Sequence, residues 1–299
     1  MVRSSPLRSA GTGWKRDAIN LTWAGLSLDS PRVMGVLNIT PDSFSDGGHH
    51  LDPDTAIRVG LAMAKAGADI VDVGGESTRP HSQPTTPEQE QTRVLPVIRA
   101  LAAAGLRVSI DTRHAVTMAA ALDAGATIVN DVTALTHDPA AAPLVAARGC
   151  PVILMHMRGD FATMYAQAVY TDVPHQVREE LAARIAAAET IGIHRTQIAI
   201  DPGIGFAKTA PQSAAMLRGL TTLHDLGCPI LIGVSRKSFI GALADAPEAA
   251  RRLPGSLAAA LFAITQGAAI LRVHDVPETI QALRIWQSLT TPTAPPQPA

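Results

Sequence analysis

The chain has 299 residues, of which 46% are hydrophobic and 17% charged, and its formal net charge at pH 7 is −1. This balance excludes an electrostatic case for binding nucleic acid or an acidic membrane surface. The two cysteines, Cys150 and Cys228, lack the spacing of a disulfide framework or a zinc site and fit a reducing compartment. No apolar run reaches the roughly 18 residues that a membrane span requires. We therefore expect a cytoplasmic protein without a membrane anchor.

The two ends of the chain differ in composition from the segment between them. The first residues carry basic side chains and no acidic one, but Pro6, Gly11 and Gly13 oppose the amphipathic helix of a transit peptide. The last ten residues are rich in proline. We expect a flexible leader and lead-in to the fold at 1–30, one catalytic domain at 31–289 and a disordered tail at 290–299.

Eight short apolar runs alternate with longer runs rich in alanine and leucine. Each short run is almost continuously apolar, which is typical of parallel strands that are buried on both faces. The predicted strands are, in chain order, Arg32–Leu37, Asp69–Val73, Arg107–Ile110, Thr127–Val129, Val152–Met155, Gln197–Ile200, Ile230–Gly233 and Ala269–Val273.

The longer runs carry helix start and stop signals. Asp52 and Asp138 each precede a proline, which predicts a capped helix start, and Thr86 begins a capping box. Eight strand–helix units without a dinucleotide fingerprint after the first strand predict a single-domain α/β fold, the (β/α)₈ TIM barrel. Glycines predict helix ends just before the next strand at Gly67, Gly105, Gly125, Gly149, Gly192, Gly227 and Gly267.

Nearly every predicted strand ends in a polar residue. In such a barrel the residues just past the carboxyl ends of the strands face the active site. A single polar strand end can simply cap the next helix, and this structural interpretation weighs most for Asp72 and His156. Eight polar ends in register favour a functional site. The set comprises Asn38, Asp72, Asp111, Asn130, His156, Asp201, Ser235 with Lys237, and Arg272 with His274.

Three of these strand ends suit a flat heterocycle. Asp111 and Asp201 offer carboxylates, and Asn130 offers an amide. Carboxylates accept the N–H donors of an aminopyrimidine edge, and an amide can pair with an edge that both donates and accepts.

A second group suits an anion. Lys237 and Arg272 bring positive charge, and His274 lies two residues beyond Arg272. A diphosphate would fit such a group. In a structural interpretation, Arg272 would instead form an ion pair with Asp201 or Asp275.

Eight motifs stand in the chain in a fixed order: Val33–Gly48, Gly67–Pro80, Ser109–Thr112, Ile128–Val132, Met155–Arg158, Ile200–Lys208, Gly233–Gly241 and Leu271–Asp275. In these motifs, which keep the family order and extend over about residues 32–288, the chain resembles the dihydropteroate synthases. Ala207 and His81 depart from the family pattern, where glycine is usual, and so does Ser213, where asparagine is expected. These departures put the conformation of the loops in doubt.

The resemblance implies that para-aminobenzoate is joined to 6-hydroxymethyl-7,8-dihydropterin diphosphate, which yields 7,8-dihydropteroate and pyrophosphate in folate biosynthesis. It also implies a sulfonamide target, a homodimer formed through helices late in the barrel, and Mg²⁺ bound to Asn38 and the diphosphate. The pterin pocket would comprise Asp111, Asn130, Met155, Asp201, Phe206 and Lys237. The diphosphate site would comprise Asn38, Thr78, Arg79, Arg272 and His274. The para-aminobenzoate site would comprise Phe44, Thr78, Pro80, Lys237 and Ser238.

An SN1-like route fits these residues. The dihydropterin delocalises the cation that forms when the bond to diphosphate breaks, and the weakly nucleophilic arylamine needs no strong general base. The loop around Asp42 and Phe44 could close over the cation and exclude water. The catalytic set is therefore Asp42, Asp111, Lys237, Arg272 and His274.

Two other functions remain open. A pterin-binding domain of a corrinoid methyltransferase would share Asp111, Asn130 and Asp201, but it would not need the 38–44 loop or the Ser235–Ser238 run. A degenerate pterin-binding partner of the folate pathway would not need intact Lys237, Arg272 and His274. Pyrophosphate release with and without para-aminobenzoate distinguishes these functions from the synthase.

Overall fold

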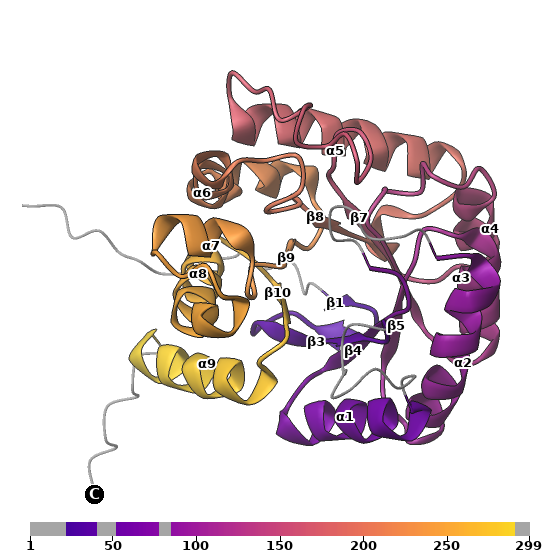
Figure 1. Ribbon diagram of the computed structural model, residues 1–299. Helices are drawn as coiled ribbons and strands as arrows, with labels where there is room; N and C mark the ends of the chain where they lie inside the picture. Colours follow the sequence, from indigo (N-terminus) through magenta and orange to yellow (C-terminus); the bar gives the residue numbers. More distant parts are fainter. Residues whose placement is uncertain (1–21, 41–51, 78–84, 291–299) are drawn as a thin grey trace, which may run out of the picture.

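The structure is a computed structural model that describes residues 22–40, 52–77 and 85–290 (Figure 1). Eight parallel strands form a ring in the order β8-β7-β6-β5-β4-β3-β10-β9, and a bridge between Ile200 and Ile230 joins β8 to the lead-in of β9 and closes it. The predicted (β/α)₈ barrel is confirmed. The strands are β3 (Arg32–Asn38), β4 (Ile70–Gly74), β5 (Val108–Asp111), β6 (Ile128–Asp131), β7 (Val152–Met155), β8 (Ile198–Asp201), β9 (Leu231–Ile232) and β10 (Ile270–Val273).

Helices surround the ring, as Figure 1 shows. They cover the outer face of the strands with their apolar sides, and all seven predicted helix-ending glycines have positive φ. The α-helices are α1 (Pro53–Ala66), α2 (Pro87–Ala103), α3 (Ala115–Asp123), α4 (Ala141–Arg148), α5 (Val173–Thr190), α6 (Ala210–Arg218), α7 (Ser238–Leu243), α8 (Leu253–Thr265) and α9 (Val276–Thr290). Short 3₁₀ segments lie at η1 (Arg195–Gln197), η2 (Leu220–Leu226) and η3 (Ala249–Arg252).

Two of the three predicted helix starts are confirmed. Asp52 caps α1, and Thr86 forms its capping box at α2. The start predicted after Asp138 is wrong by two residues, because α4 begins at Ala141. The Asp138 carboxylate instead accepts hydrogen bonds from Ala140 N at 2.9 Å and from Ala115 N, at the start of α3, at 2.8 Å.

The amino end of the barrel is closed by a feature outside the predicted strands. A hairpin of β1 (Thr22–Trp23) and β2 (Leu26–Ser27) covers this end. It packs Trp23, which is only 1% exposed, against a cluster of apolar side chains inside the ring. Trp23 Nε1 donates to the carbonyl of Gln197 at 2.8 Å. This end is therefore apolar and filled, and the polar strand ends lie at the opposite end, hereafter the barrel mouth. The inner cluster comprises Trp23, Leu28, Met34, Ile70, Ile128, Ile153, Ala199, Leu231, Ala269 and Ile270.

Within the described residues, no helix combines the length and apolar character that crossing a membrane requires.

Candidate active site

The polar residues predicted at the strand ends share the barrel mouth. Asn38, Asp111, Met155 and Asp201 are the last residues of their strands, and Asn130 pairs in register with Asp111. Arg272 lies on β10, and the ring of strands brings it to the same end. Asp42, Phe44, Thr78, Arg79, Pro80 and His81 lie outside the described residues.

Arg272 bridges two carboxylates at the mouth. Its Nε donates to Asp72 Oδ2 and its second terminal nitrogen donates to Asp111 Oδ2, each at 2.6 Å. The ion pairs with Asp201 or Asp275 considered for Arg272 are not the ones that form, and Asp275 pairs with Arg236 instead. Burial raises the pKa of Asp111 above its ordinary value, and Arg272 opposes this rise. The arginine is thus positioned by acids that line the predicted pterin pocket.

Asp72 is a site residue, although its position in the sequence suggested that it caps the next helix. Its side chain is fully buried, and Oδ2 accepts from Arg272 and also from Asn130 Nδ2 at 3.1 Å. It therefore orients both the cation and the amide of the mouth. The signal was present, because Asp72 is the only charged residue inside an otherwise apolar predicted strand core, Ile70–Val73.

Asp201, Lys237 and Arg272 converge above Gly233. A Cβ atom built on Gly233 would lie 3.9 Å from Asp201 Oδ2, Lys237 Nζ and Arg272 Cβ. Burial raises the pKa of Asp201, while the charge of Lys237 is the largest influence that lowers it. Burial also lowers the pKa of Lys237 to about 8, and the carboxylate of Asp201 opposes that change. Asp201, which is buried, and Lys237, which is half-buried, thus form a charged wall of the barrel mouth.

Phe206 provides an apolar face beside this wall. Its ring centroid lies 4.6 Å from Lys237 Nζ, within the range of a cation–π contact. Lys237 Nζ also donates a hydrogen bond to the carbonyl oxygen of Ile204, in the loop that carries Phe206. A planar ligand could therefore stack near Phe206 while its edge meets Asp201.

His274 is held as a neutral hydrogen-bond donor. Ser235 Oγ accepts from the His274 backbone N–H at 3.2 Å and lies 3.0 Å from Nδ1. In the tautomer in which Oγ donates its own proton to Nδ1, Nε2 carries the ring proton. Burial, followed by the charge of Arg272, lowers the pKa of His274 to about 4. The imidazole thus offers an N–H to an anion without adding a charge.

Asn38 is the predicted metal ligand. Its Oδ1 and the Cβ of Asp111 each lie 3.5 Å from where a Cβ on Gly74 would stand, so the amide oxygen lies beside Asp111 and a methyl group on Gly74 would contact it. Across the described ranges, no group of three His, Cys, Asp or Glu could hold a metal ion. Mg²⁺ usually takes one or two protein oxygens together with substrate phosphates. A half-buried amide oxygen at the barrel mouth fits that habit.

Two departures from the family pattern have visible consequences. Ala207 adopts φ 47°, a left-handed conformation that favours glycine, so the loop beside Phe206 is locally strained. Ser213 is buried in α6, and its Oγ has no hydrogen-bond partner among the residues described. Neither residue contacts the charged groups of the mouth in any hydrogen bond or ion pair of the described structure.

The chain matches the family model for pterin binding enzymes over residues 34–274. The dihydropteroate synthase of Mycobacterium leprae (strain TN) is 47% identical over 266 residues, which are 87% of this chain and 94% of that protein. The dihydropteroate synthase of Escherichia coli (strain K12) is 43% identical over 264 residues, or 88% of this chain and 93% of that protein.

Solved structures agree with this match. The dihydropteroate synthase of Xanthomonas albilineans with 4-aminobenzoic acid superposes with a TM-score of 0.85 at 45% identity, covering 90% of this chain and 97% of that chain. The same enzyme in complex with 7,8-dihydropteroate gives a TM-score of 0.82 at 43% identity, with 90% of this chain and 97% of that chain covered. The enzyme of Yersinia pestis with a sulfonamide drug gives 0.84 at 40% identity, with 88% and 96% covered.

Proposed function

The chain belongs to the dihydropteroate synthases, within the pterin binding enzymes, and we infer that it condenses 6-hydroxymethyl-7,8-dihydropterin diphosphate with para-aminobenzoate. The products are 7,8-dihydropteroate and pyrophosphate, so the enzyme is a transferase of folate biosynthesis. The observation that carries this function is the convergence of Asp201, Lys237 and Arg272 above Gly233. It brings a carboxylate acceptor for a pterin edge together with the ammonium of Lys237 and the base of the Arg272 side chain at one place in the barrel mouth.

We assign the pterin to the acidic side of the mouth. Asp201 Oδ1 already accepts from Gly203 N at 2.7 Å, which leaves Oδ2 to accept the N–H donors of the aminopyrimidine. Asn130 gives its N–H to Asp72, so its oxygen remains to accept from the ring. Met155 and Phe206 would supply the apolar faces between which a flat ring can lie.

We assign the leaving group to the cationic side. Arg272 and the Nε2 proton of His274 would hold the diphosphate, together with Thr78 and Arg79 from outside the described residues. Charge on the diphosphate grows as its bond to the pterin breaks, and fixed donors stabilise that state more than the ground state. Asp111, bonded to Arg272, would lie near the cationic pterin and favour its formation. This supports the SN1-like route.

Mg²⁺ is the cofactor that this site would take, with Asn38 as its protein ligand. When bound, the ion would neutralise charge on the diphosphate. The residues of the chain would orient the pterin and bind the pyrophosphate.

The second substrate would enter beside α7. Ser238 begins this helix directly after Lys237, so the stem of Lys237 and the first turn of α7 could border para-aminobenzoate. Phe44, Thr78 and Pro80 would complete that site, and Asp42 would belong to the loop that excludes water. Since para-aminobenzoate and sulfonamides share an arylamine, we expect sulfonamides to occupy the same place.

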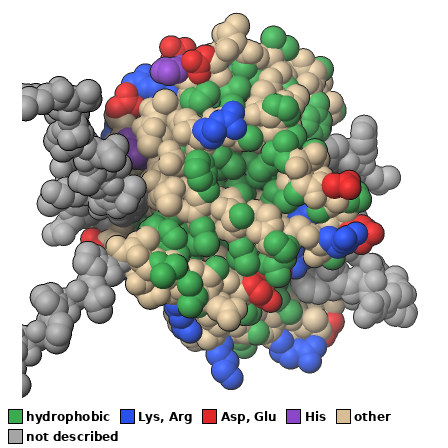
Figure 2. Space-filling view, turned by 90° about the vertical axis from the view of Figure 1, so that its left-hand side faces the viewer, with side chains coloured by type: hydrophobic (Ala, Val, Ile, Leu, Met, Phe, Trp, Pro, Cys, Tyr) green, Lys and Arg blue, Asp and Glu red, His purple; other side chains and the backbone are tan. Residues whose placement is uncertain are grey.

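We also propose a homodimer formed through the late helices. Figure 2 shows hydrophobic side chains gathered on the face that lies to the left in Figure 1, where α7, α8 and α9 are found. Leu243 of α7, Phe262 of α8 and Ile285 of α9 are exposed. Exposed apolar patches of this kind mark interfaces. Sedimentation should show a dimer for the wild type and a monomer for Phe262→Asp; a monomeric wild type would overturn the assignment.

The free cysteines support a cytoplasmic location. Cys150 and Cys228 are both buried and unpaired, as is usual in a reducing compartment.

The function is tested by pyrophosphate release with para-aminobenzoate added and omitted. We expect release with the arylamine present, matched by one equivalent of dihydropteroate identified by mass. No release, or release without formation of dihydropteroate, would favour a pterin binder or a methyltransferase domain.

A further inference from the structure

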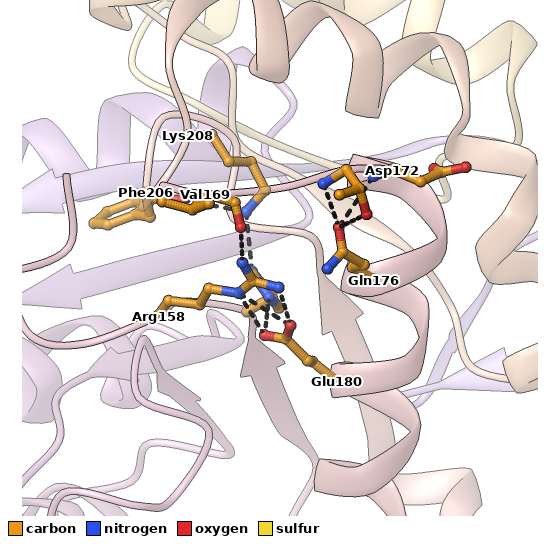
Figure 3. Close-up of polar contacts among 9 residues, drawn as sticks. Arg158, Val169, Asp172, Gln176, Glu180, Phe206 and Lys208 are labelled. Carbon is orange, nitrogen blue, oxygen red and sulfur yellow. Dashed lines mark hydrogen bonds and ion pairs between the residues drawn. The ribbon is translucent and has the colours of Figure 1, made fainter. Parts of the chain in front are cut away.

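A buried polar cluster lies next to the loop between β8 and α6, residues 202–209, hereafter the pterin loop (Figure 3). At its centre is Lys208, which is only 2% exposed. Lys208 Nζ lies 2.9 Å from His156 Nδ1 and donates to the carbonyl oxygens of Gly203 and Phe206, each at 3.2 Å. A lysine so deeply buried is costly unless its charge is well compensated.

The hydrogen bonds fix the proton positions in this cluster. His156 Nε2 lies 2.9 Å from Glu180 Oε2, and a carboxylate can only accept, so Nε2 carries the ring proton. Nδ1 must then accept from Lys208. Two carbonyl oxygens and one ring nitrogen therefore surround Nζ, which matches the three N–H donors of an ammonium. Burial lowers the pKa of His156 to about 4, so its ring is neutral.

The far side of the cluster is anchored by Arg158. Its guanidinium donates to both oxygens of Glu180 and to the carbonyl of Val169, and it lies 3.9 Å from the Tyr170 ring centroid. Figure 3 shows Arg158 and Glu180 side by side below Lys208. Glu180 is thus held in place to accept from His156.

The pterin loop has a backbone that needs such support. Gly203, Gly205 and Ala207 have φ values of 67°, 81° and 47°, all in the left-handed region. The loop also fits tightly on its neighbour, because a Cβ on Gly203 would lie 2.0 Å from the carbonyl oxygen of His156. Lys208 binds the carbonyls of Gly203 and Phe206, and so ties the two ends of this strained segment together.

Lys208 also acts on Asp201 through its charge, although burial lowers the pKa of Lys208 itself to about 7 against the opposing charge of Asp201. Asp201 precedes the loop and is nearly fully buried, which raises the pKa of its carboxyl. Lys237 opposes this rise most strongly, followed by the Gly203 N–H and then by Arg272 and Lys208. Lys237 is expected to contact the substrate, whereas Lys208 is enclosed by protein.

We propose that Lys208 is a positioning residue for pterin recognition: it holds the pterin loop so that Asp201 and Phe206 face the ligand, and it is itself fixed by His156 and Glu180. Lys208 does not contact the pterin in this proposal. The inference rests on the proposed function, since it names how one of the two substrates of that reaction is recognised.

The test compares the two substrates in Lys208→Met, which keeps a long apolar stem and removes the ammonium. We expect the affinity for a bare pterin, measured by calorimetry, to fall at least about tenfold, as for a lost charged hydrogen-bond network. The KM for para-aminobenzoate should stay within about twofold. Lys65→Met, at an exposed lysine in the last turn of α1, is the matched control and should change neither value.

A second variant keeps the test decisive if Lys208→Met does not fold. Glu180→Gln alters the partly exposed outer end of the cluster, and we expect about a threefold loss of pterin affinity, again with little change for para-aminobenzoate. Unchanged pterin affinity in whichever variants fold would overturn the proposal. A proportional loss for both substrates would also overturn it, as the sign of a purely structural role. Wild-type turnover in the same preparations tests the proposed function separately.

Discussion

Replacing Arg272 by methionine should damage both stability and turnover, with a defined pH dependence. Methionine keeps most of the apolar stem and removes the guanidinium that bridges Asp72 and Asp111. Two carboxylates would then face each other in the mouth without a cation. Breaking a buried ion pair by removing one partner costs about 3–5 kcal/mol. The side chain of Arg272 is 21% exposed, so we expect a loss of folding free energy near the lower value.

The loss should depend on pH through proton uptake. Burial raises the pKa of Asp111 in the folded state, and the charge of Arg272 opposes that rise. In the variant this opposing charge is lost, so the pKa of Asp111 rises further. A group whose folded pKa lies above its unfolded pKa stabilises the protein at low pH, and this contribution disappears as the pH rises through the folded pKa. The variant should therefore be closest to the wild type at about pH 5 and furthest from it at about pH 8.

Urea unfolding at these two pH values measures the stability, and pyrophosphate release measures the chemistry. We expect kcat to fall about 10²–10³-fold, by analogy with the loss of one donor that stabilises developing negative charge. Arg272→Lys, which keeps the charge but not the fork, should lose less stability. Adding Asp72→Asn to the methionine variant should restore part of the stability at about pH 8. Equal stability losses at both pH values would show that Arg272 does not compensate the charge of Asp111, and normal turnover would show that it does not act on the leaving group.

Three further predictions concern other parts of the barrel. Ser235→Ala removes the hydroxyl at Nδ1 of His274. The KM for the diphosphate substrate should rise about fivefold, since one hydrogen bond contributes about 1 kcal/mol, and an unchanged KM in steady-state kinetics would contradict this. Trp23→Ala should lower the free energy of unfolding by about 3–5 kcal/mol in a urea titration while both KM values stay constant; altered KM values would mean that the closed end reaches the site. Finally, kcat/KM should fall as the pH rises above about 8, because the neutral amine of Lys237 no longer attracts the carboxylate of Asp201 or an anionic substrate. Lys237→Arg should move this limb to higher pH, and an unmoved limb would assign it to another group.

The barrel could be predicted from the sequence because its signals are local. Each strand is a short apolar run, and seven of the helical segments are followed by a glycine that proves to have positive φ. The hairpin at Thr22–Ser27 carries no comparable signal, since each of its strands has two residues. Its burial depends on the finished barrel, whose open amino end Trp23 fills.

The members of the site were predictable, but their partners were not. Polar residues at the carboxyl ends of parallel strands must lie at the same end of the ring. That Asp111, Asp201 and Arg272 lie close together therefore follows from their positions in the sequence. Which carboxylate meets Arg272 depends on barrel closure, because Asp72 lies 200 residues away along the chain. The sequence suggested Asp201 or Asp275 as a partner, and the folded ring selects Asp72 and Asp111.

The cluster around Lys208 escaped prediction for a similar reason. His156 stood out as a polar strand end, and Lys208 as the last residue of a motif. Nothing in their spacing of 52 residues indicates that they meet. Only the packing of the pterin loop on β7 turns two separate signals into one network.

The most direct test of the account is a crystal structure with the pterin diphosphate and Mg²⁺ bound. We expect the aminopyrimidine edge on Asp201 and Asn130, the diphosphate within hydrogen-bond distance of Arg272 and of Nε2 of His274, and the metal on Asn38. A pterin bound away from Asp201, or a diphosphate that leaves Arg272 paired only with Asp72 and Asp111, would contradict the assignment of the barrel mouth as the active site.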